Sequence, residues 1–223
     1  MSTRRRRIAG TALTLAILLV SPAVAQESAA DFWDRVFRER AFRAVGDDDF
    51  IAYCTERLLR ERKLQRGNQV LVLAMGDGRN AVHLAQQGLA VTGLDISEVA
   101  LKKARAAAAE RGLEITALSA DLFEHDLGTE RWDLVTNVYF NPAIRVFERI
   151  KRAVRPGGFL LVEGFGSEHR SGPPEWSRYR PGELLEKLKG WRILEYQDGL
   201  FPSHWAGKGD FPVVRVLAQK PAD

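Results

Sequence analysis

The stretch NQVLVLAMGDGRNAVHLAQQG, residues 68–88, joins an apolar run, a glycine loop and a helical pattern without interruption. The apolar run has the length of a strand that is buried on both faces of a parallel sheet. Gly76 and Gly78 lack a Cβ, so the turn can be tight and a ligand can lie against the backbone. The helix expected from Arg79 offers free N–H groups and the positive end of its dipole to a carboxylate or a phosphate. This stretch therefore predicts a strand, a ligand-binding loop and a helix.

Strand and helix patterns alternate along the rest of the chain. Strand patterns at 89–97 and 113–121 flank an alanine-rich helical pattern that Ser97 can cap and Gly112 can close. The alternation predicts an α/β fold with a Rossmann-like, doubly wound, mostly parallel seven-stranded sheet. The last two strand patterns have no helix between them, so the last strand is expected to be antiparallel. The later elements expected are strands at 132–140, 159–165, 191–198 and 211–221, helices at 142–154 and 181–190, and a turn at 155–158.

The net charge of the chain comes from its first residues. Lys and Arg number 33 against 29 Asp and Glu, and Arg4–Arg7 account for the whole excess. A nucleic-acid-binding protein needs a basic patch on its folded domain. We therefore expect no nucleic-acid partner.

The first 25 residues have the organisation of an export signal. Arg4–Arg7 precede the apolar run Ile8–Val20, and Ala23-Val24-Ala25 fits a small-x-small cleavage site. The run is shorter than the roughly 20 residues that span a bilayer. We expect a signal peptide at 1–25, an exported, periplasmic protein, and membrane contact only through this segment, as a cleaved signal or an N-terminal anchor. If this interpretation is wrong, the protein is cytoplasmic.

Two acids follow strands that lie after the glycine loop. Asp95 ends the second strand, where a carboxylate can accept hydrogen bonds from both hydroxyls of a ribose. Its alternative role is to cap the next helix, which Ser97 can also do. Asp121 follows the third strand, where it can accept from an adenine amino group or be a solvent-facing turn residue. The spacing Gly76-x-Gly78-x-x-Ala81 also satisfies a dinucleotide fingerprint.

Over residues 31–221 the chain resembles the class I S-adenosylmethionine-dependent methyltransferases, and among them the tellurite-resistance-type (TehB-like) small-molecule enzymes. The resemblance rests on VLVLAMGDGRNAVHLAQQGLAVTGLDIS, ALSADLFE, FERIKRAVRPGGFLLVEGF and FPVVRVLAQKP. It implies an S-adenosylmethionine-binding domain at 67–223 and an N-terminal helical lid segment at 26–66. Trp33 would then be a lid residue, with simple helix packing as the alternative.

The same resemblance implies a set of cofactor-binding residues. The glycine loop would flank the methionine part, and Arg79 would orient its carboxylate or stabilise the start of the helix. The second strand would bind the ribose, the third would border the adenine, and the fourth would lie beside the sulfonium. The residues implied are Ala74, Met75, Gly76, Asp77, Gly78, Arg79, Asp95, Ile96, Asp121, Leu122, Asn137 and Val138.

The glycine loop departs from the common pattern of the family. Many members carry an acid where this chain has Val72, and a glycine where it has Ala74, which Met75 follows. A neutral Val72 removes one indirect anchor for the ammonium group of the cofactor. Backbone carbonyls of the loop, or Asp77, could take over this role.

Methyl transfer from a sulfonium is an in-line displacement, in which the protein mainly aligns the reactants and excludes water. Tyr139 is the candidate for orienting or deprotonating a small-molecule acceptor, with packing as the alternative. His204 is a candidate polar contact of the site or a surface histidine. The four histidines have no metal-like spacing, so no metal is expected.

Two other functions stay open at this stage. One is a module that kept the fold and binds S-adenosylmethionine or S-adenosylhomocysteine without turnover, an interpretation based on Val72 and Met75. A nicotinamide-binding oxidoreductase would use the dinucleotide spacing, but the closing strand pair argues against it.

Overall fold

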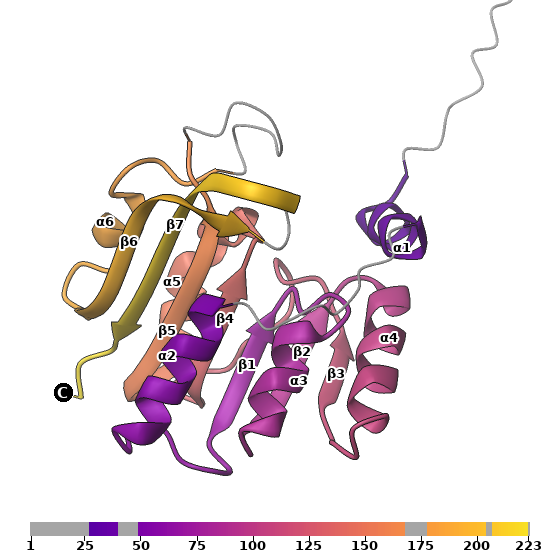
Figure 1. Cartoon of the computed structure of the whole chain (residues 1–223), viewed down its shortest axis with the longest axis horizontal. Coiled ribbons are helices and arrows are strands. Elements are labelled where there is room, and N and C mark those ends of the chain that lie inside the picture. The colour runs from indigo at the N-terminus through magenta and orange to yellow at the C-terminus, as the bar shows by residue number, and fades with distance from the viewer. Residues whose placement is uncertain (1–26, 40–48, 168–177, 204–206, 223) are drawn as a thin grey trace, which may run out of the picture.

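Seven strands form a single sheet in the computed structural model, which describes residues 27–39, 49–167, 178–203 and 207–222 (Figure 1). The strand order is β3-β2-β1-β4-β5-β7-β6, and β7 runs antiparallel to both of its neighbours. The predicted doubly wound, mostly parallel sheet with an antiparallel last strand is confirmed. The strands are β1 (Gln69–Leu73), β2 (Ala90–Asp95), β3 (Thr116–Ser119), β4 (Trp132–Val138), β5 (Val154–Phe165), β6 (Arg192–Ser203) and β7 (Gly207–Gln219).

Helices cover both faces of the sheet, with a core cluster on each side (Figure 1). One face carries α2 (Asp49–Arg60), α3 (Arg79–Gln86) and α4 (Glu98–Ala109), and the other carries α5 (Phe147–Ala153) and α6 (Glu183–Lys187). The first helix, α1 (Ala29–Glu39), lies near the start of α4, above the ends of the parallel strands. Cys54 of α2 is fully buried, which is typical of a structural thiol.

The helix predicted at 142–154 is two elements in the structure. A 3-10 helix, η1 (Asn141–Val146), precedes α5. The Asn141 amide donates to the carbonyl of Phe165 at 2.9 Å, which ties the first turn to the end of β5. A tight 3-10 turn is a common way for a tethered helix to begin.

The turn predicted at 155–158 lies inside β5. Gly157 has a φ of 73°, and the pairing of β4 with β5 shifts its register between Trp132 and Leu134. The left-handed glycine absorbs an irregularity while pairing continues. The expectation of a separate turn is therefore wrong.

The C-terminal hairpin is longer than expected. Most of 199–211, which has loop-like Gly, Pro and Ser residues, belongs to β6 and β7, and Phe201 pairs with Phe211. Cross-strand pairing outweighs the weak strand propensity of these residues. Because β7 begins at Gly207 and pairs with β5 from Val213, the hairpin extends past the carboxyl end of β5.

Two expectations about the N-terminal part stay as predictions. The signal segment 1–25 lies outside the described residues, and no observation tests the boundary between 26–66 and 67–223. Within the described ranges, no helix has both the length and the apolar character that crossing a membrane requires.

Candidate functional site

The glycine loop leaves β1 through a series of left-handed residues. Ala74, Gly76 and Gly78 have φ values of 46°, 60° and 85°. The Met75 N–H donates to the carbonyl of Leu94 at 2.9 Å, so the loop is held against the end of β2. A Cβ on Gly78 would lie 2.5 Å from the Cβ of Ala104 in α4. Glycine is therefore required at position 78 both by conformation and by the close approach of α4.

Asp95 connects the end of β2 to the glycine loop. Its Oδ2 accepts from the Gly76 N–H at 2.8 Å, and its Oδ1 accepts from the Ser97 N–H at 2.9 Å. Burial raises the pKa of the carboxyl, while the N–H groups of Ser97 and Gly76 oppose that shift. Ser97 caps α4, as predicted, because its Oγ accepts from the Ala100 N–H at 3.1 Å. Asp95 is thus freed from capping and instead fixes the loop.

The helix α1 is docked on this loop. Asp34 Oδ1 accepts from the Ser97 hydroxyl at 2.6 Å and from the Val99 N–H at 3.2 Å. The ring of Phe37 lies 3.2 Å from the position that a Cβ on Gly76 would take. Lys103 also donates to the carbonyl of Phe37. These contacts place α1 over the glycine loop and the start of α4, where a lid would lie.

Sequence reasoning named Trp33 in this helix and missed Asp34. The ring of Trp33 packs within α1, 5.3 Å from Phe32 and 6.2 Å from Phe37 between ring centroids. The signal for Asp34 was available, because Asp34 lies three residues before the apolar Phe37, at the spacing of one helical face. An acid on the apolar face of a helix needs a partner.

The other residues predicted in the glycine loop differ in their surroundings. Met75 points into the core, since a Cβ on Gly93 would lie 2.0 Å from its sulfur. Asp77 is half-buried, and burial raises the pKa of its carboxyl against the lowering effect of Arg79. Arg79 is the first residue of α3. Val72 is buried in the core beneath the loop.

The segment after β3 begins beside Asp95. The Ala120 N–H donates to the carbonyl of Asp95 at 3.0 Å, so the two acid-bearing strand ends are adjacent. Asp121 Oδ1 accepts from the Phe123 N–H at 2.8 Å, and Leu122 is buried in the core. Ile96, between Asp95 and Ser97, is half-buried.

The end of β4 is tied to the segment after β5. Asn137 donates through Nδ2 to the carbonyl of Phe140 at 3.2 Å and to the hydroxyl of Tyr179 at 3.3 Å. Its Oδ1 is buried and accepts no hydrogen bond from the described residues. Tyr179 is fully buried, which raises the pKa of its phenol. The sequence did not predict that Tyr179 contacts Asn137, because the two residues are 42 positions apart.

Tyr139 has a backbone conformation that is rare for a side chain of its size. Its φ is 57°, and its N–H donates to the carbonyl of Glu163 at 2.7 Å. Its ring lies 4.8 Å from that of Phe165. Such conformations cost free energy and occur most often at functional sites. Val138, the residue before it, is half-buried, and the predicted contact His204 lies outside the described residues.

In the described part of the chain, the residues predicted to bind the cofactor at the ends of β1, β2, β3 and β4 lie at one edge of the sheet. This edge is formed by the carboxyl ends of the parallel strands. Open α/β sheets bind their ligands at this edge. Within the described ranges, no group of three or more His, Cys, Asp or Glu could hold a metal ion.

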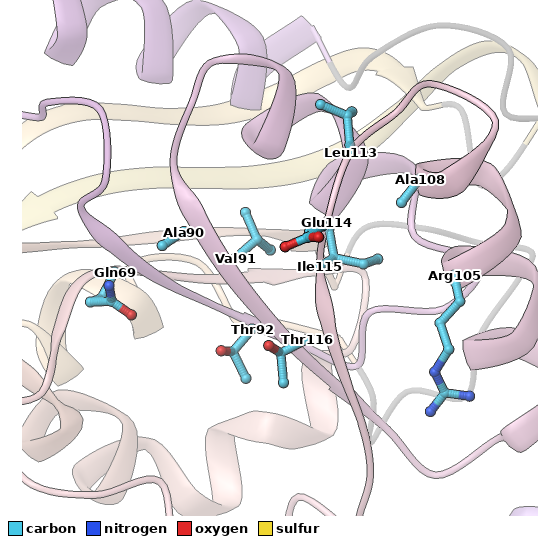
Figure 2. A pocket seen from close by; sticks show the side chains of 10 residues that line it. All are labelled: Gln69, Ala90, Val91, Thr92, Arg105, Ala108, Leu113, Glu114, Ile115 and Thr116. Carbon is cyan, nitrogen blue, oxygen red and sulfur yellow. The ribbon is translucent and has the colours of Figure 1, made fainter.

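A cavity of about 600 Å³ lies at the opposite edge of the sheet (Figure 2). Its lining comes from the first residues of β1, β2 and β3, such as Gln69 and Thr116, and from Arg105 and Ala108 of α4. It is therefore separate from the glycine loop.

Residues 70–158 match the family model of a methyltransferase domain. The matched segment contains the glycine loop and its bonded Asp95, and the sheet has the fold of the class I S-adenosylmethionine-dependent methyltransferases. The methyl donor of this class of enzyme is S-adenosyl-L-methionine.

Individual proteins are also similar to this chain in sequence or in fold. The chain is 28% identical over 178 residues to a ubiquinone biosynthesis O-methyltransferase of Alkalilimnicola ehrlichii, covering 76% of this chain and 67% of the relative. An uncharacterised protein of Mycobacterium tuberculosis is 27% identical over 179 residues, covering 74% of this chain, which spans only 65% of that relative's length. The crystal structure of TehB from Haemophilus influenzae superimposes with a TM-score of 0.63 at 21% identity, covering 74% of this chain and 62% of TehB.

Proposed function

We propose that this protein transfers the methyl group of S-adenosylmethionine to a small-molecule acceptor. The observation that carries the proposal is the bond between Asp95 and the Gly76 N–H, which joins the ribose-binding candidate to the glycine loop. A carboxylate oxygen has more than one acceptor position, so Asp95 can hold the loop and still accept from a ribose hydroxyl. The acid is buried at the edge where the cofactor of this fold binds.

The residues at this edge fit the parts of the cofactor. Gly76 and Gly78 allow the methionine part to approach the backbone, and Asp121 with Leu122 borders the adenine. Asn137 and Val138 lie at the end of β4, beside the position proposed for the sulfonium. The buried Asn137 Oδ1, which accepts no hydrogen bond from the part of the chain that the structure describes, is an acceptor that a ligand can use.

We assign the role of the missing acid at Val72 to Asp77. Val72 is buried in the core and neutral, whereas Asp77 lies between the two glycines and is half-buried. A partly desolvated carboxylate attracts an ammonium group more strongly than an exposed one. Asp77→Asn is expected to weaken S-adenosylmethionine binding more than binding of S-methyl-5′-thioadenosine, which lacks the ammonium, in calorimetric titrations. Equal losses for the two ligands would remove this assignment.

The protein contributes alignment and exclusion of water to the reaction. The cofactor supplies the electrophilic methyl group when it is bound. Tyr139, held in its rare conformation between the ends of β4 and β5, orients the acceptor or takes its proton. The α1 helix covers the loop and limits the access of water.

Calorimetry with S-adenosylmethionine and S-adenosylhomocysteine on the full chain tests the proposal. We expect micromolar binding, and a loss of about tenfold or more in Asp95→Asn, because one acceptor for the ribose loses its charge. Glu110→Gln, at the exposed end of α4, is the matched control. Absence of both heat and thermal shift at millimolar cofactor would exclude the function.

A binding module without turnover is the second candidate, which the neutral Val72 and the core position of Met75 favour. It predicts binding of S-adenosylhomocysteine without methyl transfer to any member of a broad acceptor panel. The nicotinamide alternative is tested by fluorescence titration with NADH, for which we expect no binding.

The narrower class and the location are also proposals. The run Gly76–Asn80 supports a place in the tellurite-resistance-type subgroup, which tellurite and selenite as acceptors would test. The segment 1–25 supports export to the periplasm. Fractionation with N-terminal sequencing tests export: an N-terminus at Gln26 is expected, and an intact Arg4–Arg7 segment on a cytosolic protein would contradict it.

A further inference from the structure

Arg149 of α5 reaches out of its helix to the segment that follows β3. Its Nη1 donates to the carbonyl of Phe123 at 2.6 Å, and its Nη2 donates to the carbonyl of His125. Both donors belong to one planar guanidinium, so the two carbonyls are held in a fixed relation to each other. Hydrogen bonds from an ionised donor are also stronger than those between neutral groups.

The N–H groups of the same turn are bound to Asp121. The Phe123 N–H donates to Asp121 Oδ1 and the His125 N–H donates to the Asp121 carbonyl, both at 2.8 Å. The Glu124 N–H also donates to the Asp121 carbonyl, at 3.1 Å, so three N–H groups of the turn contact Asp121, and Arg149 holds the carbonyls of two of these residues, Phe123 and His125. The orientation of the Asp121 carboxylate therefore depends on a turn whose carbonyls are held by Arg149.

The contact also connects two parts of the site that are distant in sequence. Arg149 lies in the helix that follows η1, and η1 begins directly after Tyr139 and Phe140 at the end of β4. The guanidinium of Arg145, in η1, lies 4.3 Å from the ring centroid of Phe123. The segment that contains Asp121 is therefore held by η1 and α5, the helices that follow β4. Without such contacts a surface segment of this kind opens at low free-energy cost.

We propose that Arg149 is a positioning residue for the adenine of the cofactor. It does not touch the cofactor; it holds the Asp121–His125 turn so that the Asp121 carboxylate meets the adenine amino group. The inference rests on the proposed binding of S-adenosylmethionine. According to this inference, selectivity for adenine depends on Arg149 of α5, which lies outside the Asp121–His125 turn that contacts the base.

The test compares two ligands that differ at the base. Calorimetry measures the affinity for S-adenosylhomocysteine and for S-inosylhomocysteine, in which an oxygen replaces the amino group. The proteins are the wild-type chain, Arg149→Met, Arg149→Lys, and Arg152→Met as a control at an exposed position of the same helix. Hydrogen exchange of the Phe123 and His125 amides reports the turn itself, and thermal unfolding reports the fold.

In Arg149→Met we expect the affinity for S-adenosylhomocysteine to fall about tenfold, the equivalent of one well-placed hydrogen bond to a charged group. The affinity for S-inosylhomocysteine should change little, so the ratio of the two affinities, which measures the preference for adenine, should fall. The two amides should exchange faster. Arg149→Lys should recover part of the preference, because a lysine can reach one carbonyl but lacks the fork. Arg152→Met should match the wild type.

Two results would overturn the inference. One is an Arg149→Met protein that is folded and keeps the wild-type preference for adenine. The other is an equal loss of affinity for both ligands, which indicates a general structural role. A wild-type chain that binds neither ligand refutes the proposed function itself, and the inference with it.

Discussion

The guanidinium Nε of Arg215 in β7 lies 2.8 Å from the carboxylate of Glu163 in β5, and both side chains are buried. The two residues are register partners across the antiparallel pair. The guanidinium also donates to the carbonyl of Pro202 at 3.2 Å and lies 4.8 Å from the ring centroid of Phe201. The ion pair thus joins the end of β5 to the long β6–β7 hairpin beside the site.

Removing one partner of this pair should destabilise the protein strongly. Arg215→Met removes the ion pair of the buried Glu163 carboxylate, and we expect a loss of about 3–5 kcal/mol in the free energy of unfolding. Urea denaturation measures it. Arg180→Met, which breaks the exposed pair with Glu183, is the control, with an expected loss below about 1 kcal/mol. Similar losses in the two variants would contradict the importance of burial.

A side chain at position 78 should disturb the glycine loop. Gly78→Ala places a Cβ 2.5 Å from the Cβ of Ala104 and keeps a φ of 85°, so we expect a loss of about 2–4 kcal/mol from overlap and strain together. Gly112→Ala is the matched control, with a φ of 65° and open space around the Cβ. It should lose only the conformational part, about 1–2 kcal/mol. Thermal unfolding of both variants separates the two contributions.

Position 74 is expected to accept glycine with a gain. Ala74 has a φ of 46°, which costs an L-residue about 1–2 kcal/mol, while the extra freedom of glycine in the unfolded chain costs about 0.5–1 kcal/mol. Ala74→Gly should therefore raise the free energy of unfolding by roughly 0.5–1 kcal/mol. A lower unfolding midpoint in Ala74→Gly would show that the backbone at Ala74 is not strained by its positive φ.

Docking of α1 should depend on the charge of Asp34. The hydrogen bond from the Ser97 hydroxyl lowers the pKa of this carboxyl in the folded protein and outweighs burial, which raises it; the Val99 N–H and the charge of Arg38 add smaller lowering effects. A lowered pKa stabilises docking at pH above the unfolded value of about 3.9, and the contribution is lost as the pH falls through the folded value. The hydrogen-exchange protection factors of Ala29–Glu39, which correct for slower intrinsic exchange in acid, should fall over that acidic range.

The variant Asp34→Asn checks this interpretation. It should show lower protection of the α1 amides already at neutral pH, and no further loss of protection specific to α1 in acid. Glu39→Gln, at the exposed end of the same helix, serves as the control. Unchanged protection of α1 in Asp34→Asn would mean that Phe37 and Lys103 suffice to hold the helix.

The order of the central elements could be predicted because the signals are local. The apolar run of β1, the left-handed glycines and the Ser97 cap each occupy a few consecutive residues. The length of the β6–β7 hairpin could not be predicted, because its residues have the composition of a loop and only cross-strand pairing makes them strands. The same holds for η1, whose first turn depends on a bond from Asn141 to Phe165.

By itself, the sequence determined an α/β sheet with a glycine loop and acids after successive strands, since period, chain length and turn residues act over short distances. Only the tertiary structure decided what these groups contact. In the folded chain, Asp95 accepts from the Gly76 N–H, Asp34 accepts from Ser97, and Arg149 donates to the turn that contains Asp121. Such partners lie far apart along the chain, and a buried polar group takes whichever partner the packing of the elements brings within reach.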